Sequence, residues 1–317
     1  MKKTKVFLFA ALAATVAMTS CSNDDEVITD NGAPVELRLR SVIEASPVTR
    51  AMNQDVQNTA FDANEEIDVF ISGDYTPASL YWPIKHTTDA GGAMTPSDGT
   101  TTIYFPTNGT NIVALVAIYP AEAGISLDDA YSFTVAADQS TEEGYKASDL
   151  MVAGSSNIPP ASPQVELTFS HLLTKININL EKGTGIHDFN GAKVELLNTQ
   201  LTAKSTFSIL SKNITGSEGA ATPITVMNIP AGATEFKGSA IIVPTQTVAS
   251  GTPFIKITLS DGRILTYNGW RLGVRAGERK SSDGRQTFKL PLNFLRTYTP
   301  TDAKPLVGGC YLSKLTK

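Results

Sequence analysis

The sequence predicts an all-β protein built from two tandem β-sandwich domains. Beyond residue 34 it consists of short runs in which every second residue is hydrophobic, separated by Gly, Pro, Asn, Asp and Ser. No later window of helical length carries an apolar stripe with a helical period. With 317 residues and 41% hydrophobic content, the chain is long enough to build two ordinary cores.

The predicted strands share an apolar face and are bounded by turn-forming residues. They are 35–42, 67–71, 103–105, 112–119, 131–135, 165–169, 175–180, 194–197, 206–210, 224–227, 240–243, 254–259 and 264–267. The segment 175–181 places aliphatic side chains on one face and Asn177, Asn179 and Glu181 on the other, which predicts a half-exposed strand. The segment 112–118 is apolar on both faces, so we expect a strand that is buried on both sides.

Three prolines mark the predicted domain boundary. They lie within 158–163, where proline removes backbone donors and keeps the chain extended. We therefore expect an N-terminal sandwich over 35–163, a C-terminal sandwich over 164–280 and a divergent basic tail over 281–317. A loop within a single domain is the alternative.

The first twenty residues predict export. Three lysines precede an apolar run over 6–18, which has the length of a signal-peptide core and is too short to span a bilayer. Small residues lead to Cys21, which favours cleavage between Ser20 and Cys21 by signal peptidase II after lipid transfer to the cysteine sulfur. An ordinary secretory signal with a chance cysteine is the alternative. We thus expect a lipoprotein signal peptide over 1–20 and an acidic linker over 21–34.

The linker and the remaining cysteine add to this interpretation. A three-chain lipid on Cys21 anchors a protein firmly without a transmembrane helix. The acidic tract 22–26 resembles that of surface-exposed Bacteroidetes lipoproteins, which implies the outer face of the outer membrane. Cys310 is the other cysteine in the sequence, so no intramolecular disulfide is expected. The net charge of −5 offers no basic footprint for nucleic acid.

Several segments resemble shared blocks of the Bacteroidales fimbrillin family, the subunits of type V pili. These are Asp138-Gln139, 149–153 (DLMVA), 167–176 (LTFSHLLTKI), 241–246 (IIVPTQ) and 260–267 (SDGRILTY). The resemblance extends over roughly residues 1–270. It implies two transthyretin-like Greek-key sandwiches and export as a lipoprotein.

The resemblance also implies assembly by donor-strand exchange. An arginine-specific protease would cut between Arg50 and Ala51, release the strand in 35–50 with its lipid, and open a groove for the C-terminal strand of a neighbouring subunit. The implied partners are other fimbrial subunits, that protease, the outer membrane and a host or bacterial surface receptor. The alternative is that Arg50 lies in a loop that is never cut.

The alternation of the first strand fits removal and replacement. Val35, Leu37 and Leu39 are expected to face a core while the charged residues between them face away. Each buried side chain contributes about 1.5–3 kcal/mol, so loss of the strand costs roughly 5–9 kcal/mol. The edge left open would bind a complementary strand by β-augmentation.

The C-terminal tail departs from the family pattern. From Arg271 onward there are ten Lys or Arg and three Asp or Glu, which gives this segment a charge of +7. Either the tail is a frameshifted or divergent end, or 286–292 is a genuine strand beside a natural basic tail. A stalk subunit must supply a donor strand, whereas a tip or accessory subunit needs none.

Two other classes of function are weaker interpretations. Tyr81, Trp82 and Trp270 could stack on sugar rings, which would suit a glycan-binding lipoprotein that stays anchored and monomeric. His86 and the two other histidines lie far apart, and the sequence has no nucleophile elbow, P-loop, dinucleotide fingerprint or calcium loop. We therefore expect a protein that is not an enzyme, without catalytic residues, metal or cofactor.

Overall fold

Strands dominate the computed structural model. It describes residues 34–44, 60–75, 80–106, 112–121, 123–161, 164–181, 186–229, 235–244, 246–249, 251–268, 272–273, 286–291 and 296–298. Among these residues, helix is limited to α1 (Glu142–Lys146) and one 3₁₀ turn, η1 (Ile209–Ser211). The predicted all-β class is confirmed.

Contacts divide the chain into two units, Met1–Ala33 and Pro34–Lys317. Every described residue belongs to the second unit. This unit contains both segments that we expect to be sandwich domains, so their division at 163/164 stays a prediction.

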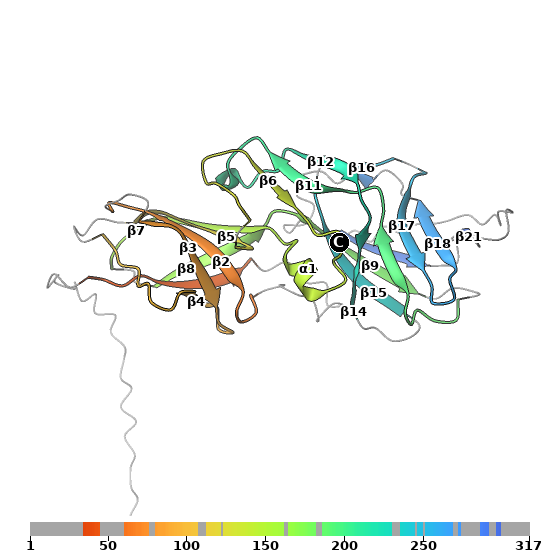
Figure 1. Ribbon diagram of the computed structural model, residues 1–317, viewed down its shortest axis with the longest axis horizontal. Helices are drawn as coiled ribbons and strands as arrows, with labels where there is room; N and C mark the ends of the chain where they lie inside the picture. The colour runs from red at the N-terminus through yellow and green to blue at the C-terminus, as the bar shows by residue number, and fades with distance from the viewer. Residues whose placement is uncertain are drawn as a thin grey trace, which may run out of the picture. The chain divides into compact units, whose positions relative to one another are not determined.

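The first sheet is a closed ring of seven strands in the order β1-β4-β3-β2-β5-β7-β8 (Figure 1). Its strands are β1 (Arg38–Ile43), β2 (Glu66–Ser72), β3 (Tyr81–Thr88), β4 (Ala93–Pro96), β5 (Ile112–Tyr119), β7 (Met151–Ile158) and β8 (Gln164–His171). β1 closes the ring because it pairs with β8 in parallel and with β4 in antiparallel orientation.

The remaining strands form two larger and two smaller sheets. Their orders are β13-β10-β17-β18-β21, β14-β15-β9-β20, β12-β11-β6 and β16-β19. The bounds are β6 (Tyr131–Thr134), β9 (Thr174–Glu181), β10 (Lys193–Leu196), β11 (Gln200–Ser205), β12 (Gly216–Ala221), β13 (Ile224–Thr225), β14 (Met227–Ile229), β15 (Glu235–Ile242), β16 (Thr247–Val248), β17 (Pro253–Thr258), β18 (Ile264–Asn268), β19 (Leu272–Gly273), β20 (Gln286–Pro291) and β21 (Arg296–Tyr298). Two of these strands, β20 and β21, lie in the basic tail.

Two hydrophobic cores share β5 and β7 as a common wall. Leu115 and Ala117 of β5 belong to the first core, inside the ring, while Val116 and Ile118 belong to the second. The prediction that 112–118 is buried on both faces is therefore confirmed. The second core also takes side chains from β6, which precedes the predicted boundary but pairs with β11.

The structure corrects three strand predictions. Residues 103–105 form no strand; they contain one isolated bridge, in which Tyr104 pairs with Glu36. The segment 206–210 is not a strand: Ser205 Oγ bonds the amide of Phe207 at 3.1 Å, and η1 follows. The predicted half-exposed strand 175–181 is β9, yet Asn177 is only 7% exposed. On the same face, the Nζ of Lys175 lies 5.6 Å from the centroid of the Tyr145 ring of α1, so this helix covers the start of that face.

The packing of β1 predicts that substitutions on its two faces differ sharply in effect. Leu39 is buried in the first core, whereas Arg40 is exposed. We expect Leu39→Ala to lower the free energy of unfolding by about 2–5 kcal/mol because it leaves a cavity, and Arg40→Ala to change it by less than about 0.5 kcal/mol. Urea denaturation followed by circular dichroism measures both, and equal losses would contradict the inward orientation of Leu39.

A buried histidine predicts a dependence of stability on pH. Burial lowers the pKa of His86 below its ordinary value, against the raising effects of a hydrogen bond to the Ile84 carbonyl and of Asp98. The folded state therefore resists protonation at pH values where the unfolded state accepts it, and stability falls as the pH drops below about 6.5.

We expect the wild-type protein to lose more thermal stability between about pH 7.5 and about pH 5 than a His86→Asn variant, in which the amide nitrogen replaces Nδ1. Melting temperatures of both proteins across this range measure the difference. Parallel pH profiles would contradict this role for His86.

Candidate functional site

The first strand presents an apolar row to the core of the ring. Leu37, Leu39 and Ile43 are 5%, 3% and 1% exposed, and Val35 packs against the same core. Arg38 and Arg40 face outward and are exposed. The orientation expected for Val35, Leu37 and Leu39 is thus observed, while displacement of the strand stays a prediction.

The backbone of β1 pairs with a neighbouring strand along each edge, and the residues just before it also bond 103–105, where the Leu37 amide donates to the Ile103 carbonyl at 2.8 Å. All six residues of β1 are in register with β8, from Arg38 beside Gln164 to Ile43 beside Phe169. Two residues, Leu39 and Arg40, are in register with β4. Removal of β1 would therefore leave the edge of β8 open along six positions.

A glycine brings the start of β4 against β1. Gly92 accepts hydrogen bonds from both the amide and the hydroxyl of Ser41, at 2.7 and 3.1 Å. Its φ of +83° is left-handed, and a Cβ there would lie 2.6 Å from the Ser41 carbonyl oxygen. A side chain at this position would push β4 away from β1.

Glu44 and Phe61, on either side of the segment 45–59 that contains Arg50, both contact Phe169 of β8. On one side, the Glu44 amide donates to the Phe169 carbonyl at 2.8 Å, and Ser170 Oγ donates to the Glu44 carboxylate at 3.0 Å. On the other, the Phe61 ring packs edge-on against Phe169 with centroids 4.9 Å apart. Phe169 is thus contacted by the chain both before and after the segment 45–59.

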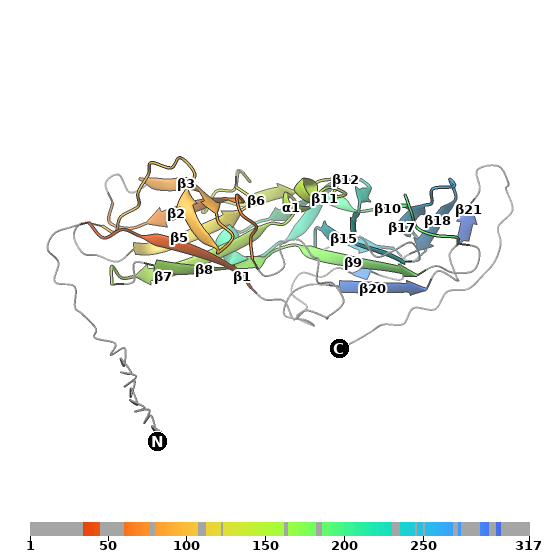
Figure 2. The same cartoon turned by 90° about the horizontal axis from the view of Figure 1, so that it is seen from below.

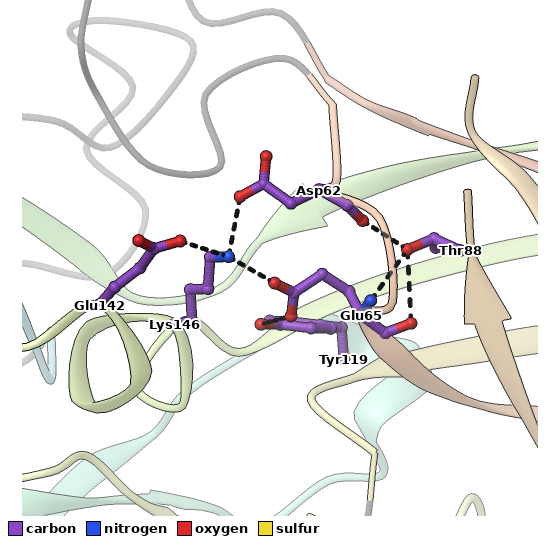
Figure 3. A network of polar contacts seen from close by, with 6 residues as sticks. All are labelled: Asp62, Glu65, Thr88, Tyr119, Glu142 and Lys146. Carbon is purple, nitrogen blue, oxygen red and sulfur yellow. Dashed lines mark hydrogen bonds and ion pairs between the residues drawn. The ribbon is translucent and has the colours of Figure 1, made fainter. Parts of the chain in front are cut away.

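A polar network fixes the chain just after Phe61 (Figure 3). We call it the Lys146 clamp; its members are Asp62, Glu65, Thr88, Tyr119, Glu142 and Lys146. The ammonium group of Lys146, at the end of α1, lies 2.8 Å from the Asp62 carboxylate, 2.6 Å from that of Glu65 and 2.7 Å from that of Glu142.

The clamp also reaches the ring through two hydroxyl groups. Tyr119 at the end of β5 donates to the second oxygen of the Glu65 carboxylate at 2.8 Å. Thr88 at the end of β3 donates to the Asp62 carbonyl at 2.7 Å and accepts from the Glu65 amide at 3.1 Å. Burial alone would lower the pKa of Lys146, but the hydrogen bonds that Lys146 donates to Asp62, Glu142 and Glu65 outweigh it and hold that pKa above its usual value. The clamp therefore keeps its positive centre.

No pattern in the sequence predicts this clamp. Phe61 is an isolated aromatic residue in a polar stretch, and neither Glu65 nor Lys146 belongs to a recognisable motif. The segment 60–65 and α1 are far apart in the chain, so spacing alone does not bring Asp62 to Lys146. Asp62 and Lys146 become neighbours only when the seven-stranded ring is folded.

Five of the site residues predicted from sequence lie outside the described residues. These are Ser20 and Cys21 of the signal cleavage, Arg50 and Ala51 of the maturation cleavage, and Trp270. Tyr81 is partly buried against Tyr75, with ring centroids 5.1 Å apart. Trp82 is 39% exposed and contacts Phe70 edge-on. The structure therefore does not join Tyr81 and Trp82 into one exposed stacking surface.

Blocks that resemble the fimbrillin family contact one another in the fold. Asp149 accepts a hydrogen bond from His171 Nδ1 at 2.8 Å. The buried Gln139 side chain bonds both backbone groups of Ile241, at 2.7 and 2.8 Å. These contacts join segments up to 102 residues apart and give the blocks a structural role at the junction of the sheets.

A strand of the basic tail, β20, shares parallel pairing with β1. β20 lies at the edge of its sheet and pairs in parallel with β9, from Gln286 beside Ile176 to Pro291 beside Glu181. β8 and β9 are consecutive strands, with β1 along the former and β20 along the latter (Figure 2). Both ends of the chain thus provide a strand by parallel pairing.

In the part of the chain that the structure describes, no group of three or more His, Cys, Asp or Glu side chains is placed to hold a metal ion. No helix in the same residues is long and apolar enough to cross a membrane.

Comparison with known proteins gives matches to a family and to solved structures. A family model described as fimbrillin-like matches residues 49–270. Among curated proteins, no sequence matches this chain significantly. The matched family is one of structural fimbrial proteins, in line with the expectation that the chain is not an enzyme.

Solved structures share the fold at low sequence identity. A candidate cell adhesion protein from Bacteroides uniformis is 21% identical, with 83% of this chain and 94% of that chain covered and a TM-score of 0.57. Another from Bacteroides ovatus is 18% identical, with 87% and 100% covered and a TM-score of 0.60. Because the family model spans more than half of the sequence, from just before Arg50 to Trp270, this chain belongs to the fimbrillin-like family.

Proposed function

We propose that this protein is a structural subunit of a fimbrium, or an accessory adhesin at its tip, that is exported as a lipoprotein and assembled by donor-strand exchange. One observation carries the proposal above all. The row of Leu37, Leu39 and Ile43 is buried on a strand that precedes Arg50 in sequence and closes the ring. A cut after Arg50 would separate that strand covalently from its sheet.

The energetics favour replacement of the strand over simple loss. Burial of these three side chains contributes about 5–9 kcal/mol, which approaches the whole stability of an ordinary domain, about 5–15 kcal/mol. A subunit without β1 would therefore be poorly stable until another strand fills the site. Incoming main-chain groups would satisfy the edge of β8, and alternate apolar side chains would fill the core.

The basic tail is the candidate donor. β20 already pairs in parallel, as β1 does, and its sequence over 287–290 alternates Phe288 and Leu290 with polar residues. If the tail is donated to a neighbour, the protein is a stalk subunit. If it stays on its own β9, the protein accepts a strand without giving one, as a tip subunit does.

Export and anchoring complete the proposal. Lipid on Cys21 would hold the protein on the outer membrane, exposed at the cell surface, and cleavage after Arg50 would pass it to the fimbrium. Two transthyretin-like Greek-key sandwiches are the architecture we propose for the two cores. Other fimbrial subunits, an arginine-specific protease and a surface receptor are the proposed partners.

Limited trypsin digestion of the purified full chain tests the proposal. We expect cleavage after Arg50 and release of the strand. The cut protein should then form a ladder of oligomers on non-reducing gels run without heating, because the unpaired backbone groups at the edge of β8 bind a strand of another molecule. An Arg50→Ala variant should stay monomeric under the same digestion.

Two results would speak against parts of this scheme. A cut protein that stays monomeric and retains its first strand contradicts strand exchange. A cut protein that releases the strand but forms no ladder restricts the chain to a tip or accessory role.

A further inference from the structure

The position of the Lys146 clamp relative to the first strand suggests a further role. None of its six members belongs to β1 or to residues 34–44. Its contacts join the segment after Phe61 to the ends of β3 and β5 and to α1. Departure of β1 would therefore break none of the hydrogen bonds and ion pairs that join the members of the clamp.

We propose that the Lys146 clamp retains residues 60–65 on the subunit when β1 leaves, so that Phe61 keeps one end of the first core covered until a new strand arrives. The inference rests on the proposed strand exchange for its biological setting. The clamp itself is a property of the intact chain and is open to test without any cleavage.

Phe61 is placed to serve as this cover. It is 3% exposed and packs against the rings of Tyr119 and Phe169, with centroids 5.0 and 4.9 Å away. Ile43 of β1 is in register with Phe169 and belongs to the same core. When Ile43 is withdrawn, Phe61 is thus the neighbouring side chain that still shields Phe169 from water.

Lys146 is the residue on which the clamp depends. Three carboxylates, from Asp62, Glu65 and Glu142, converge on its ammonium group. Without that positive charge the three carboxylates would repel one another, and Glu65 would keep its hydrogen bond from Tyr119. Lys146 therefore acts as a positioning residue for the segment 60–65.

Amide hydrogen exchange on the uncut full chain tests the clamp directly. In Lys146→Met we expect the amides of Asn64 and Glu65, which bond Thr88, to exchange at least about tenfold faster than in wild type, because opening of the segment becomes easier. Lys256→Met is the matched control, since it removes an ion pair of 2.9 Å to the largely buried Glu195 on β10. The control should leave exchange at 60–65 unchanged.

Exchange at 60–65 that is the same in Lys146→Met and wild type would overturn the clamp. So would faster exchange there in both variants, since that reports a general loss of stability. Neither result depends on whether Arg50 is cut.

Aminopeptidase trimming after trypsin examines the same clamp in the cut protein. From Ala51, we expect digestion of the wild type and of Lys256→Met to stop before Phe61, and digestion of Lys146→Met to pass Asp62, as measured by intact mass. A common stopping point for all three proteins would overturn retention after cleavage. Absence of a cut at Arg50 would instead count against the proposed function, while the exchange measurement still decides on the clamp.

Discussion

The parallel pairing of β1 with β8 is the interaction on which the functional account depends. It closes the seven-stranded ring and places Leu37, Leu39 and Ile43 in the first core. Six registered positions join β1 to β8, and two join it to β4. Backbone hydrogen bonds hold this strand along both edges, and its removal would open the ring without rearranging the order of the other strands.

The shared wall limits how far the loss of β1 would spread. β5 and β7 face the first core with one set of side chains and the second core with the other. No residue of β1 contributes to the second core. We infer that the second core stays packed against β5 and β7 when the seven-stranded ring is open. The Lys146 clamp and the Phe61 side chain then keep the part of the first core around Phe169 covered.

Much of this arrangement follows from local pattern. Strict alternation at Val35, Leu37 and Leu39, and unbroken apolar character over 112–118, specify which faces are buried because strand side chains alternate. The same reasoning fails where pattern and packing disagree. β7 lacks the alternating pattern of a strand because its residues 154–157 are small or polar. Lys175 and Asn177 are polar yet buried. The apolar residues near Ile209 lie in a turn that Ser205 holds by a hydrogen bond. The clamp cannot be predicted from the sequence because Asp62 and Lys146 come together only in the tertiary fold.

Binding of a separate first strand tests the central claim most directly. A labelled synthetic peptide of residues 34–44 is mixed with trypsin-cut and uncut full chain, and its binding is followed by fluorescence polarisation. The account predicts that the peptide binds the cut protein and not the uncut one, and that a peptide in which Leu37, Leu39 and Ile43 are replaced by Asp binds neither. The account would be contradicted if the peptide bound cut and uncut protein equally, or if the Asp-substituted peptide bound the cut protein as well as the natural peptide does.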